Sequence, residues 1–325
     1  MTWLPQLLIG VALSVVSTLI QQATAPKAQK QLPGMRGQYS TGGTVPMTIL
    51  LGTVGTPGQL EYSATWGNSG ETPNAFLADV ISLSDHPITG ITARWIDSQS
   101  VTVSGSGHVT QGYPVSAPAK FVGYGWSETY DGSQSTVSTY LTGKFGSDPE
   151  RPWLSDMIGE GIAYAIHTAR INEKLWTDFP RYMHQVQGAP VFDPRLSTAA
   201  GGSGSQVWGT FSTYTFSDNP IVLIYNILRG LHAAAGAFVW GGHATAYQLP
   251  YAEWAAAANL CDAAVTLAAG GTEKRYRAGV EISLNERPAD VIRELLVACN
   301  ARISFSRGQY HVLVDVPASA SASFA

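Results

Sequence analysis

The chain has 325 residues, of which 45% are hydrophobic and 13% are charged, and its formal net charge is −4 at pH 7. This length predicts about two or three domains, and the apolar content excludes a disordered chain because it is sufficient for sizeable cores. The negative net charge argues against a general nucleic-acid binder, which needs a basic patch or stripe. The low charge content indicates that much of the surface meets other protein.

The chain contains two cysteines, Cys261 and Cys299, and both lie in apolar segments with helical spacing. Neither belongs to a CxxC motif or to another metal-binding spacing. We therefore expect buried free thiols, which fits assembly in a reducing cytoplasm.

An uncharged apolar run occupies residues 4–20 and is followed by a polar, Gln-, Pro- and Gly-rich linker over residues 21–43. A helix that spans a bilayer needs about 20 residues, so this run is at the short limit. Three interpretations are open, namely a helix buried in a protein assembly, a membrane anchor and a signal peptide. We favour the buried helix and assign residues 1–31 to this apolar helix and its linker.

Short strand patterns dominate residues 32–190, which we assign to a β-rich domain. Apolar runs occur over residues 45–54 and 76–83. Residues 91–95 alternate between apolar and polar side chains, which is the period of a half-buried strand. A further strand is predicted over residues 101–103.

Residues 104–150 are rich in Gly, Ser, Thr and Tyr and are predicted to form an insertion of loops and small strands, at residues 120–124 and 136–141. Residues 162–171 fit a strand by alternation and a helix by their alanine content. We favour the strand, with residues 181–186 as its partner.

Residues 191–316 are assigned to an α+β domain. Its clearest element is a helix over residues 221–228, with Asp218 or Asn219 as N-cap, Pro220 at the first helical position and Gly230 as the stop. Residues 201–205, with the sequence GGSGS, are either a linker between domains or a loop within one.

The rest of the domain alternates between helices and strands. The pattern predicts a helix from Pro250 and a strand over residues 275–284. A further helix is predicted after Asn285 as its cap, with a core face of Val291, Ile292, Leu295, Leu296 and Cys299. A left-handed residue at Asn300 and a hairpin over residues 303–314 that turns at Arg307 and Gly308 follow it. Residues 317–325 read as an Ala/Ser linker-like tail. The connections are short and antiparallel, so the fold class is α+β and β-rich, with short helices packed on antiparallel sheets.

Catalytic and metal-binding motifs are missing from the sequence. It has no GxGxxG, GxxxxGK[ST], HExxH or GxSxG motif, and its seven histidines include no pair at metal-ligand spacing. We expect no cofactor, no metal and no enzymatic activity.

Two groups of residues offer weaker alternatives. Four acidic residues could supply the two carboxylates of a glycoside hydrolase, although a solvated loop is the simpler interpretation; they are Asp148, Glu150, Asp156 and Glu160. Four aromatic residues could form a carbohydrate platform, although a strand that packs its rings into a core is preferred; they are Trp208, Phe211, Tyr214 and Phe216.

An ordered series of motifs surrounds an Asp-Pro-Arg turn, in which the proline fixes a chain reversal. The residues of this series are Phe192, Asp193, Pro194, Arg195, Trp208, Asp218, Asn219 and Pro220. The series resembles the hub region of phage tail tip proteins, the group of the tip attachment protein J of phage lambda and related tail proteins of prophages and gene transfer agents.

Other segments share this resemblance, which covers most of residues 44–315; they are residues 85–91, 159–171, 274–284, 288–300 and 303–314. The chain departs from the family pattern at His86, where glycine is usual, and over residues 104–150.

The resemblance implies a structural virion protein, the central hub that closes the distal end of a long non-contractile tail. Such hubs are homotrimers on the tail axis, with tube-like β domains that mimic tail-tube subunits. By this resemblance the partners are a second and third copy, the distal tail protein, the tape measure protein and other tail tip or receptor-binding proteins. DNA would pass only in transit, no stable membrane contact is expected, and the protein would be located at the tail tip of the virion after assembly in the host cytoplasm.

Two functions from other classes remain as alternatives. One is a membrane-anchored or secreted bacterial surface protein, in which residues 4–20 are the anchor or signal. The other is a wall-degrading tail enzyme, which would need two facing carboxylates in a cleft.

Overall fold

The structure is a computed structural model that describes residues 46–176, 178–233 and 235–315. The chain divides into two compact units, Met1–Arg36 and Gly37–Ala325, and all of the described residues belong to the second. The predicted N-terminal apolar helix and the tail over residues 317–325 lie outside the described residues. Among the residues described, no helix is long and apolar enough to cross a membrane.

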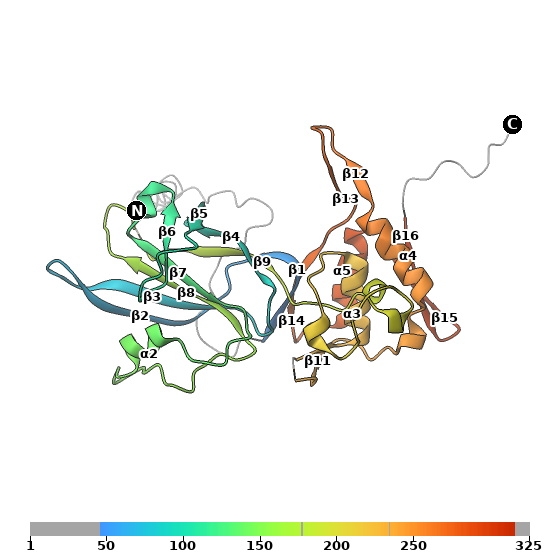
Figure 1. Cartoon of the computed structure of the whole chain (residues 1–325), viewed down its shortest axis with the longest axis horizontal. Helices are drawn as coiled ribbons and strands as arrows, with labels where there is room; N and C mark the ends of the chain where they lie inside the picture. The colour runs from blue at the N-terminus through green and yellow to red at the C-terminus, as the bar shows by residue number, and fades with distance from the viewer. Residues whose placement is uncertain (1–45, 177, 234, 316–325) are drawn as a thin grey trace, which may run out of the picture. The chain divides into compact units, whose positions relative to one another are not determined.

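One large antiparallel sheet organises the described chain, with its strands in the order β14-β1-β9-β4-β5-β6-β7-β8-β3-β2 (Figure 1). The ten strands are β1 (Thr48–Thr56), β2 (Gln59–Ser69), β3 (Thr72–Ser84), β4 (Gly90–Ile96), β5 (Gln99–Val103), β6 (Tyr113–Ala117), β7 (Gly125–Tyr130), β8 (Ala163–Arg170), β9 (Tyr182–Gln187) and β14 (Gly279–Ser283). The strand predictions over residues 45–54, 76–83, 91–95 and 101–103 are confirmed.

Residues 162–171 form the strand β8, as predicted, but their predicted partner is wrong. β8 pairs with β3 and β7, whereas β9 pairs with β1 and β4. The sheet curls, so β8 and β9 meet through side chains across its interior without sharing backbone hydrogen bonds. Proximity along the chain therefore suggested a hairpin that the curled sheet does not contain.

Apolar side chains fill both sides of the sheet. The inner face forms a core that includes Leu50, Ile81, Val115, Ala165 and Val186. The outer face of β2, β3 and β8 is covered by helix α2 (Thr139–Phe145), whose buried residues are Tyr140, Leu141 and Phe145. Because both faces of β8 are covered, seven of its eight residues are buried, which explains its Ala-rich sequence.

Two strand predictions within residues 104–150 are wrong. Residues 120–124 overlap a single 3-10 turn, η1 (Ala119–Phe121), and residues 136–141 lead into the helix α2. The local reason for the helix is Ser138, whose hydroxyl accepts the Leu141 backbone N–H at 3.3 Å. The strands β6 and β7 of the same segment are part of the large sheet.

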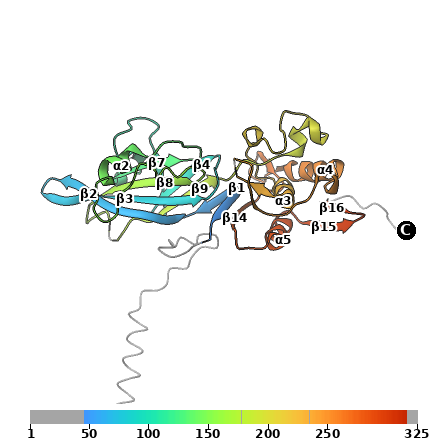
Figure 2. The same ribbon diagram turned by 90° about the horizontal axis from the view of Figure 1, so that it is seen from below.

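Three helices form a second cluster, in which α3 packs against both of the others; they are α3 (Pro220–Arg229), α4 (Tyr251–Asp262) and α5 (Pro288–Ala298) (Figure 2). α3 begins at Pro220 after the N-cap Asn219, as predicted, and eight of its residues are buried. It ends at Arg229 and is followed by the capping residue Gly230, which has a φ of 98°. A Cβ added at Gly230 would lie 2.6 Å from the Gly242 carbonyl oxygen, so only glycine fits there.

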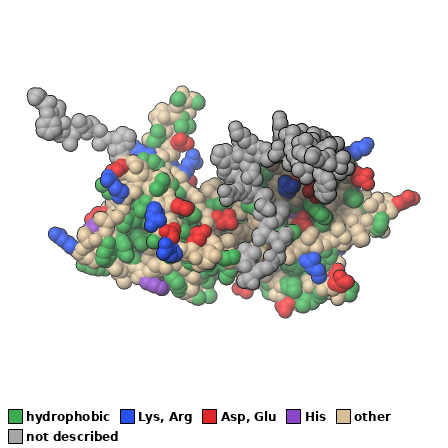
Figure 3. Space-filling model, turned by 180° about the vertical axis from the view of Figure 1, so that it is seen from behind, with side chains coloured by type: hydrophobic (Ala, Val, Ile, Leu, Met, Phe, Trp, Pro, Cys, Tyr) green, Lys and Arg blue, Asp and Glu red, His purple; other side chains and the backbone are tan. Residues whose placement is uncertain are grey.

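Three small hairpins complete the fold of the described residues; they are β10 (Leu231–His232) with β11 (Phe238–Trp240), β12 (Ala264–Thr266) with β13 (Thr272–Lys274), and β15 (Ala301–Ser306) with β16 (Gln309–Val314). All six residues of β12 and β13 are exposed. Figure 3 shows this hairpin projecting from the surface, with hydrophobic and uncharged side chains at its tip and charged side chains at its base.

The predicted turn at Arg307 and Gly308 and the left-handed residue Asn300 are confirmed by positive φ angles of 51°, 78° and 49°. The predicted cap Asn285 is wrong: the N-cap position of α5 is Arg287, which makes no side-chain capping bond. Pro288 can begin the helix there because the first helical residue needs no N–H partner. The strand predicted over residues 275–284 is shorter than expected, since β14 begins at Gly279.

The fold class is confirmed as α+β and β-rich. β14 pairs with β1, so the large sheet takes strands from both sides of the boundary predicted at residue 190. That boundary stays a prediction. Cys261 and Cys299 are both buried and free, as expected.

Candidate functional site

The Asp-Pro-Arg turn is held by its own side chains. Asp193 caps the 3-10 turn η2 (Pro194–Leu196) by accepting the Arg195 backbone N–H at 3.0 Å. The backbone N–H of Asp193 donates to Gln206 Oε1 at 2.7 Å. The loop over residues 201–205 folds back onto this turn, since the Ser203 N–H donates to the Arg195 carbonyl at 2.9 Å. It is therefore a loop within a packed region and not a linker.

Arg195 is the centre of the motif network, and its side chain is 19% exposed. The guanidinium holds Asp193 as a fork, with Nε at 3.0 Å from Oδ1 and Nη2 at 2.7 Å from Oδ2. Its third nitrogen, Nη1, contacts Asp262 Oδ2 at 2.8 Å and donates to Asn259 Oδ1 at 2.9 Å. This planar geometry suits arginine and not lysine.

Lys274 extends the network to the start of α3. Its Nζ lies 2.8 Å from Asp218 Oδ1 and 3.1 Å from Asp262 Oδ1. Asp262, at the end of α4, is thus shared between Arg195 and Lys274. The alternating acids and bases connect the turn, the end of α4, the strand β13 and the start of α3.

The charges of the network stabilise one another. Burial opposes the charge of Arg195, but the hydrogen bonds and charges of Asp193 and Asp262 outweigh it and raise the pKa of the guanidinium. For Asp262, burial acts to raise the pKa, but hydrogen bonds from Arg195 and Lys274 are together stronger and lower it. Arg195 and Asp262 are therefore both ionised at neutral pH.

Asn219 links α3 to α4 and is fully buried. Its Oδ1 accepts the backbone N–H groups of Ile221 and Val222 at 3.0 and 3.4 Å, which is the N-cap bond. Its Nδ2 donates to the Ala258 carbonyl at 2.8 Å. The prediction left Asp218 and Asn219 open as caps, and the structure assigns the cap to Asn219 and the ion pair to Asp218.

Phe192 anchors the turn in the core of the helical cluster and is 2% exposed. The side-chain amide of Asn226 on α3 binds both backbone polar groups of Phe192. The Phe192 N–H donates to Asn226 Oδ1 at 3.0 Å, and Asn226 Nδ2 donates to the Phe192 carbonyl at 2.7 Å. The ring meets Trp208 edge-on, with the centroids 5.4 Å apart. The Arg229 guanidinium covers Trp208 in turn, at 3.9 Å from the centroid of its ring.

The aromatic strand predicted around Trp208 is wrong. Its residues form loops and a 3-10 turn, η4 (Phe211–Thr213), with a bridge from Thr215 to Val191. The rings pack around Phe192 without the alternation of a strand, because each is placed by a turn. The packing part of the interpretation stands, since Trp208 and Tyr214 are half-buried against the core.

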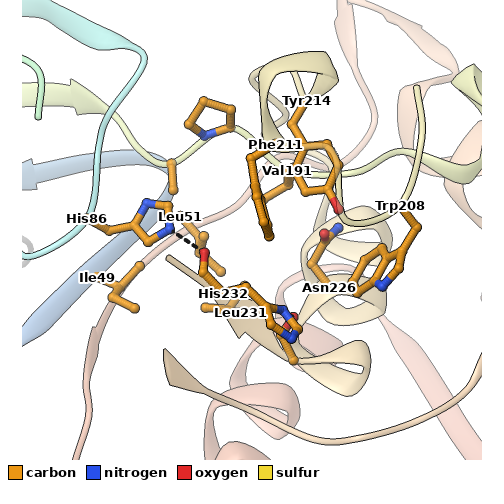
Figure 4. A pocket seen from close by; sticks show the side chains of 13 residues that line it. Ile49, Leu51, His86, Val191, Trp208, Phe211, Tyr214, Asn226, Leu231 and His232 are labelled. Carbon is orange, nitrogen blue, oxygen red and sulfur yellow. Dashed lines mark hydrogen bonds between the residues drawn. The ribbon is translucent and has the colours of Figure 1, made fainter. Parts of the chain in front are cut away.

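A small cavity lies beside these aromatic rings (Figure 4). His86 reaches it from the β3–β4 connection and binds the His232 carbonyl through Nε2 at 3.0 Å. Trp208, Phe211 and Tyr214 close it from the other side. Its volume of about 20 Å³ has room for one water and not for a substrate.

The acidic residues considered for glycoside hydrolysis lie in the loop after α2. Glu150, Asp156 and Glu160 are exposed and Asp148 is half-buried. Asp148 Oδ1 accepts the backbone N–H groups of Arg151 and Glu150 at 2.8 and 2.9 Å, and these bonds lower the pKa of its carboxyl. Asp148 therefore has a local structural role in the turn.

The structure brings the motif residues into one region around the start of α3, and it adds partners that the sequence did not reveal. These are Gln206, Asn226, Asn259, Asp262 and Lys274. Asp262 carried a usable signal, since an acid at the end of a helix opposes the helix dipole and needs a cation. The charged groups are satisfied by one another, and among the described residues no group of three or more His, Cys, Asp or Glu side chains could hold a metal.

No known protein family and no curated protein matches the sequence. A chain in the solved structure titled "Virion of native gene transfer agent (GTA) particle" superposes with a TM-score of 0.44 and 12% sequence identity, over 93% of this chain and 62% of that chain. The chain thus spans less than two thirds of that protein, and a likeness this distant does not establish a shared fold.

Proposed function

We propose that this protein is a structural virion protein, the central hub at the distal end of a long non-contractile phage tail. It would act without catalysis, as a homotrimer on the tail axis. Its partners would be the distal tail protein, the tape measure protein and other tail tip or receptor-binding proteins, and DNA would pass only during ejection.

The observation that carries this proposal is the convergence of the family-like motif series into one closed network. Arg195 and Lys274 form ion pairs with Asp262, so these charges are neutralised within the network and have a structural role. A catalytic centre would instead leave a polar group directed at an open cleft. The cavity beside the motif, at about 20 Å³, is too small for a substrate.

The β12–β13 hairpin supports the assembly role. All of its strand residues are exposed, and it carries the apolar residues Val265 and Leu267, which are 37% and 38% exposed. An isolated two-stranded hairpin is marginally stable in water, and projecting apolar side chains favour contact with another chain. We therefore assign this hairpin to a contact with a neighbouring subunit of the tail tip.

This proposal is tested by replacing Val265 and Leu267 with serine. Because Val265 and Leu267 are 37% and 38% exposed, replacing them removes only part of a buried contact, and the free energy of unfolding should fall by about 1 kcal/mol. Incorporation of the protein into particles should fall by about tenfold or more in a complementation assay, as expected when apolar anchors of an interface are removed. The control is Leu313→Ser, because Leu313 is an exposed apolar residue that belongs to β16 and not to the hairpin. Normal incorporation of the hairpin variant would refute the contact, and normal infectivity of particles without the protein would refute the structural role.

A further inference from the structure

Two buried histidines meet in the interior of the large sheet. His167 on β8 and His184 on β9 are 3% and 0% exposed, and their Nε2 atoms are 2.8 Å apart. Because β8 and β9 are not neighbours in the strand order, this bond spans the interior and connects two halves of the curled sheet. The assembly proposal does not use either residue.

The strand registers define the surroundings of the pair. His167 lies opposite Asp79 on β3 and Ser127 on β7, and His184 lies opposite Thr56 on β1 and Arg94 on β4. Four titratable or charged side chains surround the pair. Asp79 and Arg94 are the cross-strand neighbours of His167 and His184, and the ring of Tyr182 stacks on His167 at a centroid distance of 4.0 Å. Glu281 on β14 hydrogen-bonds to Thr56, which is the other cross-strand neighbour of His184.

The N···N distance requires one ring to donate and the other to accept, which two neutral rings with complementary tautomers can do. A first added proton would place a positive charge in an apolar interior beside Arg94. A second would turn both Nε2 atoms into donors and break the bond. Burial, together with the charge of the other ring and of Arg94, lowers the pKa of His167 well below its ordinary value. Burial and Arg94 lower the pKa of His184 to about 3.

We propose that His167 and His184 form an acid-sensitive clasp, which holds β8 and β9 together across the interior while both rings are neutral and releases them when they take up protons from solvent. The unfolded chain protonates these rings near pH 6.5, whereas the folded chain does so only at lower pH. Their stabilising contribution is therefore complete above about pH 6.5 and is lost as the pH falls below that value.

Asp79 acts in the opposite direction. Burial raises its pKa from 3.8 to about 6, and the Ser63 hydroxyl, which donates to Oδ1 at 2.6 Å, only partly reverses this. The folded state thus binds an extra proton between pH 6 and 3.8, which cancels one of the two histidine protons. Burial raises the pKa of Glu281 as well, so this carboxyl offsets a further part of the histidine protons. In this range the wild-type unfolding constant should therefore rise by about tenfold or less per unit fall in pH, since one net proton gives tenfold.

The test compares urea unfolding between about pH 4.5 and 7.5, a range that brackets the unfolded histidine pKa, in three variants of the full chain. His167→Phe/His184→Phe should abolish or reverse the acid-induced loss of stability, because the proton uptake of Asp79 is then unopposed. Asp79→Asn should make the wild-type loss steeper. Leu141→Ala, which destabilises the protein without changing a titratable group, is the control and should lower the free energy of unfolding by the same amount at each pH. A double phenylalanine variant with the wild-type slope would overturn the proposal.

A second measurement applies even if the double variant does not fold. Nitrogen-15 spectra of the wild-type rings should show neutral, complementary tautomers at about pH 6, where free histidine is already largely protonated, and imidazolium signals from both rings at that pH would contradict the clasp. In hydrogen-exchange measurements at about pH 5, the backbone amides of β8 and β9 should exchange faster than those of α3. Simultaneous opening of all three elements would show that no local release occurs.

Discussion

Arg195 illustrates how a single side chain can join distant parts of this chain. Its fork on Asp193 fixes the turn, and its remaining nitrogen reaches Asp262, which Lys274 also binds. The segments that carry these residues are far apart in sequence but meet at one guanidinium. The residue therefore contributes to the fold by fixing how the turn sits against α4.

Replacing Arg195 with alanine should destabilise the protein by about 2 kcal/mol, because it leaves the buried Asp193 carboxylate without its cation and Asp262 with Lys274 alone. This loss is smaller than that for a fully buried pair, since the Asp262 side chain is 26% exposed and solvent screens its charge. Arg195→Lys should recover only about half, since lysine keeps the charge and loses the fork.

The matched control is Arg302→Ala, because Arg302 pairs with Asp315 at 2.7 Å but its side chain is 71% exposed. Its free energy of unfolding should change by less than about 0.5 kcal/mol. If the two variants lost the same free energy of unfolding in urea, the ion-pair network of Arg195 would stabilise the protein no more than an exposed ion pair does.

At the scale of elements, α2 shows how a short apolar segment can be misread. Residues 136–141 resemble a strand, yet the cap at Ser138 and the packing of Leu141 and Phe145 on the sheet make the segment helical. Tertiary packing decides such short runs, because seven residues form too few turns for helix propensity to dominate.

Leu141→Ala should cost about 3 kcal/mol, the range for a fully buried leucine that leaves a cavity. Thr139→Ala in the same helix is exposed and should change stability by less than about 0.5 kcal/mol. Similar effects of the two substitutions in thermal or urea unfolding would mean that α2 does not pack on the sheet.

Other elements could be predicted from the sequence because their signals are local. The start of α3 follows from Asn219 and Pro220, and the last hairpin follows from its turn at Arg307 and Gly308. Strand pairing was harder to predict, since the partner of β8 depends on how the whole sheet curls. The ion pairs of Asp262 and Lys274 were also hidden, because they join segments that no sequence spacing relates.

At the scale of the whole molecule, the sheet formed by the described residues ends in two edge strands, β2 and β14, and the β12–β13 hairpin projects from the surface beyond it. Natural proteins rarely leave such edges and apolar tips open, since both invite contact with other chains. The proposed role as a subunit of an assembly accounts for these features, because neighbouring subunits would cover the sheet edges and the apolar hairpin. It also accounts for the low charge content.

The most direct test of this account is the copy number and location of the protein in purified particles, measured by cryo-electron microscopy with a bound antibody fragment as a marker. The account predicts three copies on the axis at the distal end of the tail. A monomer found in the membrane fraction and absent from particles would contradict it.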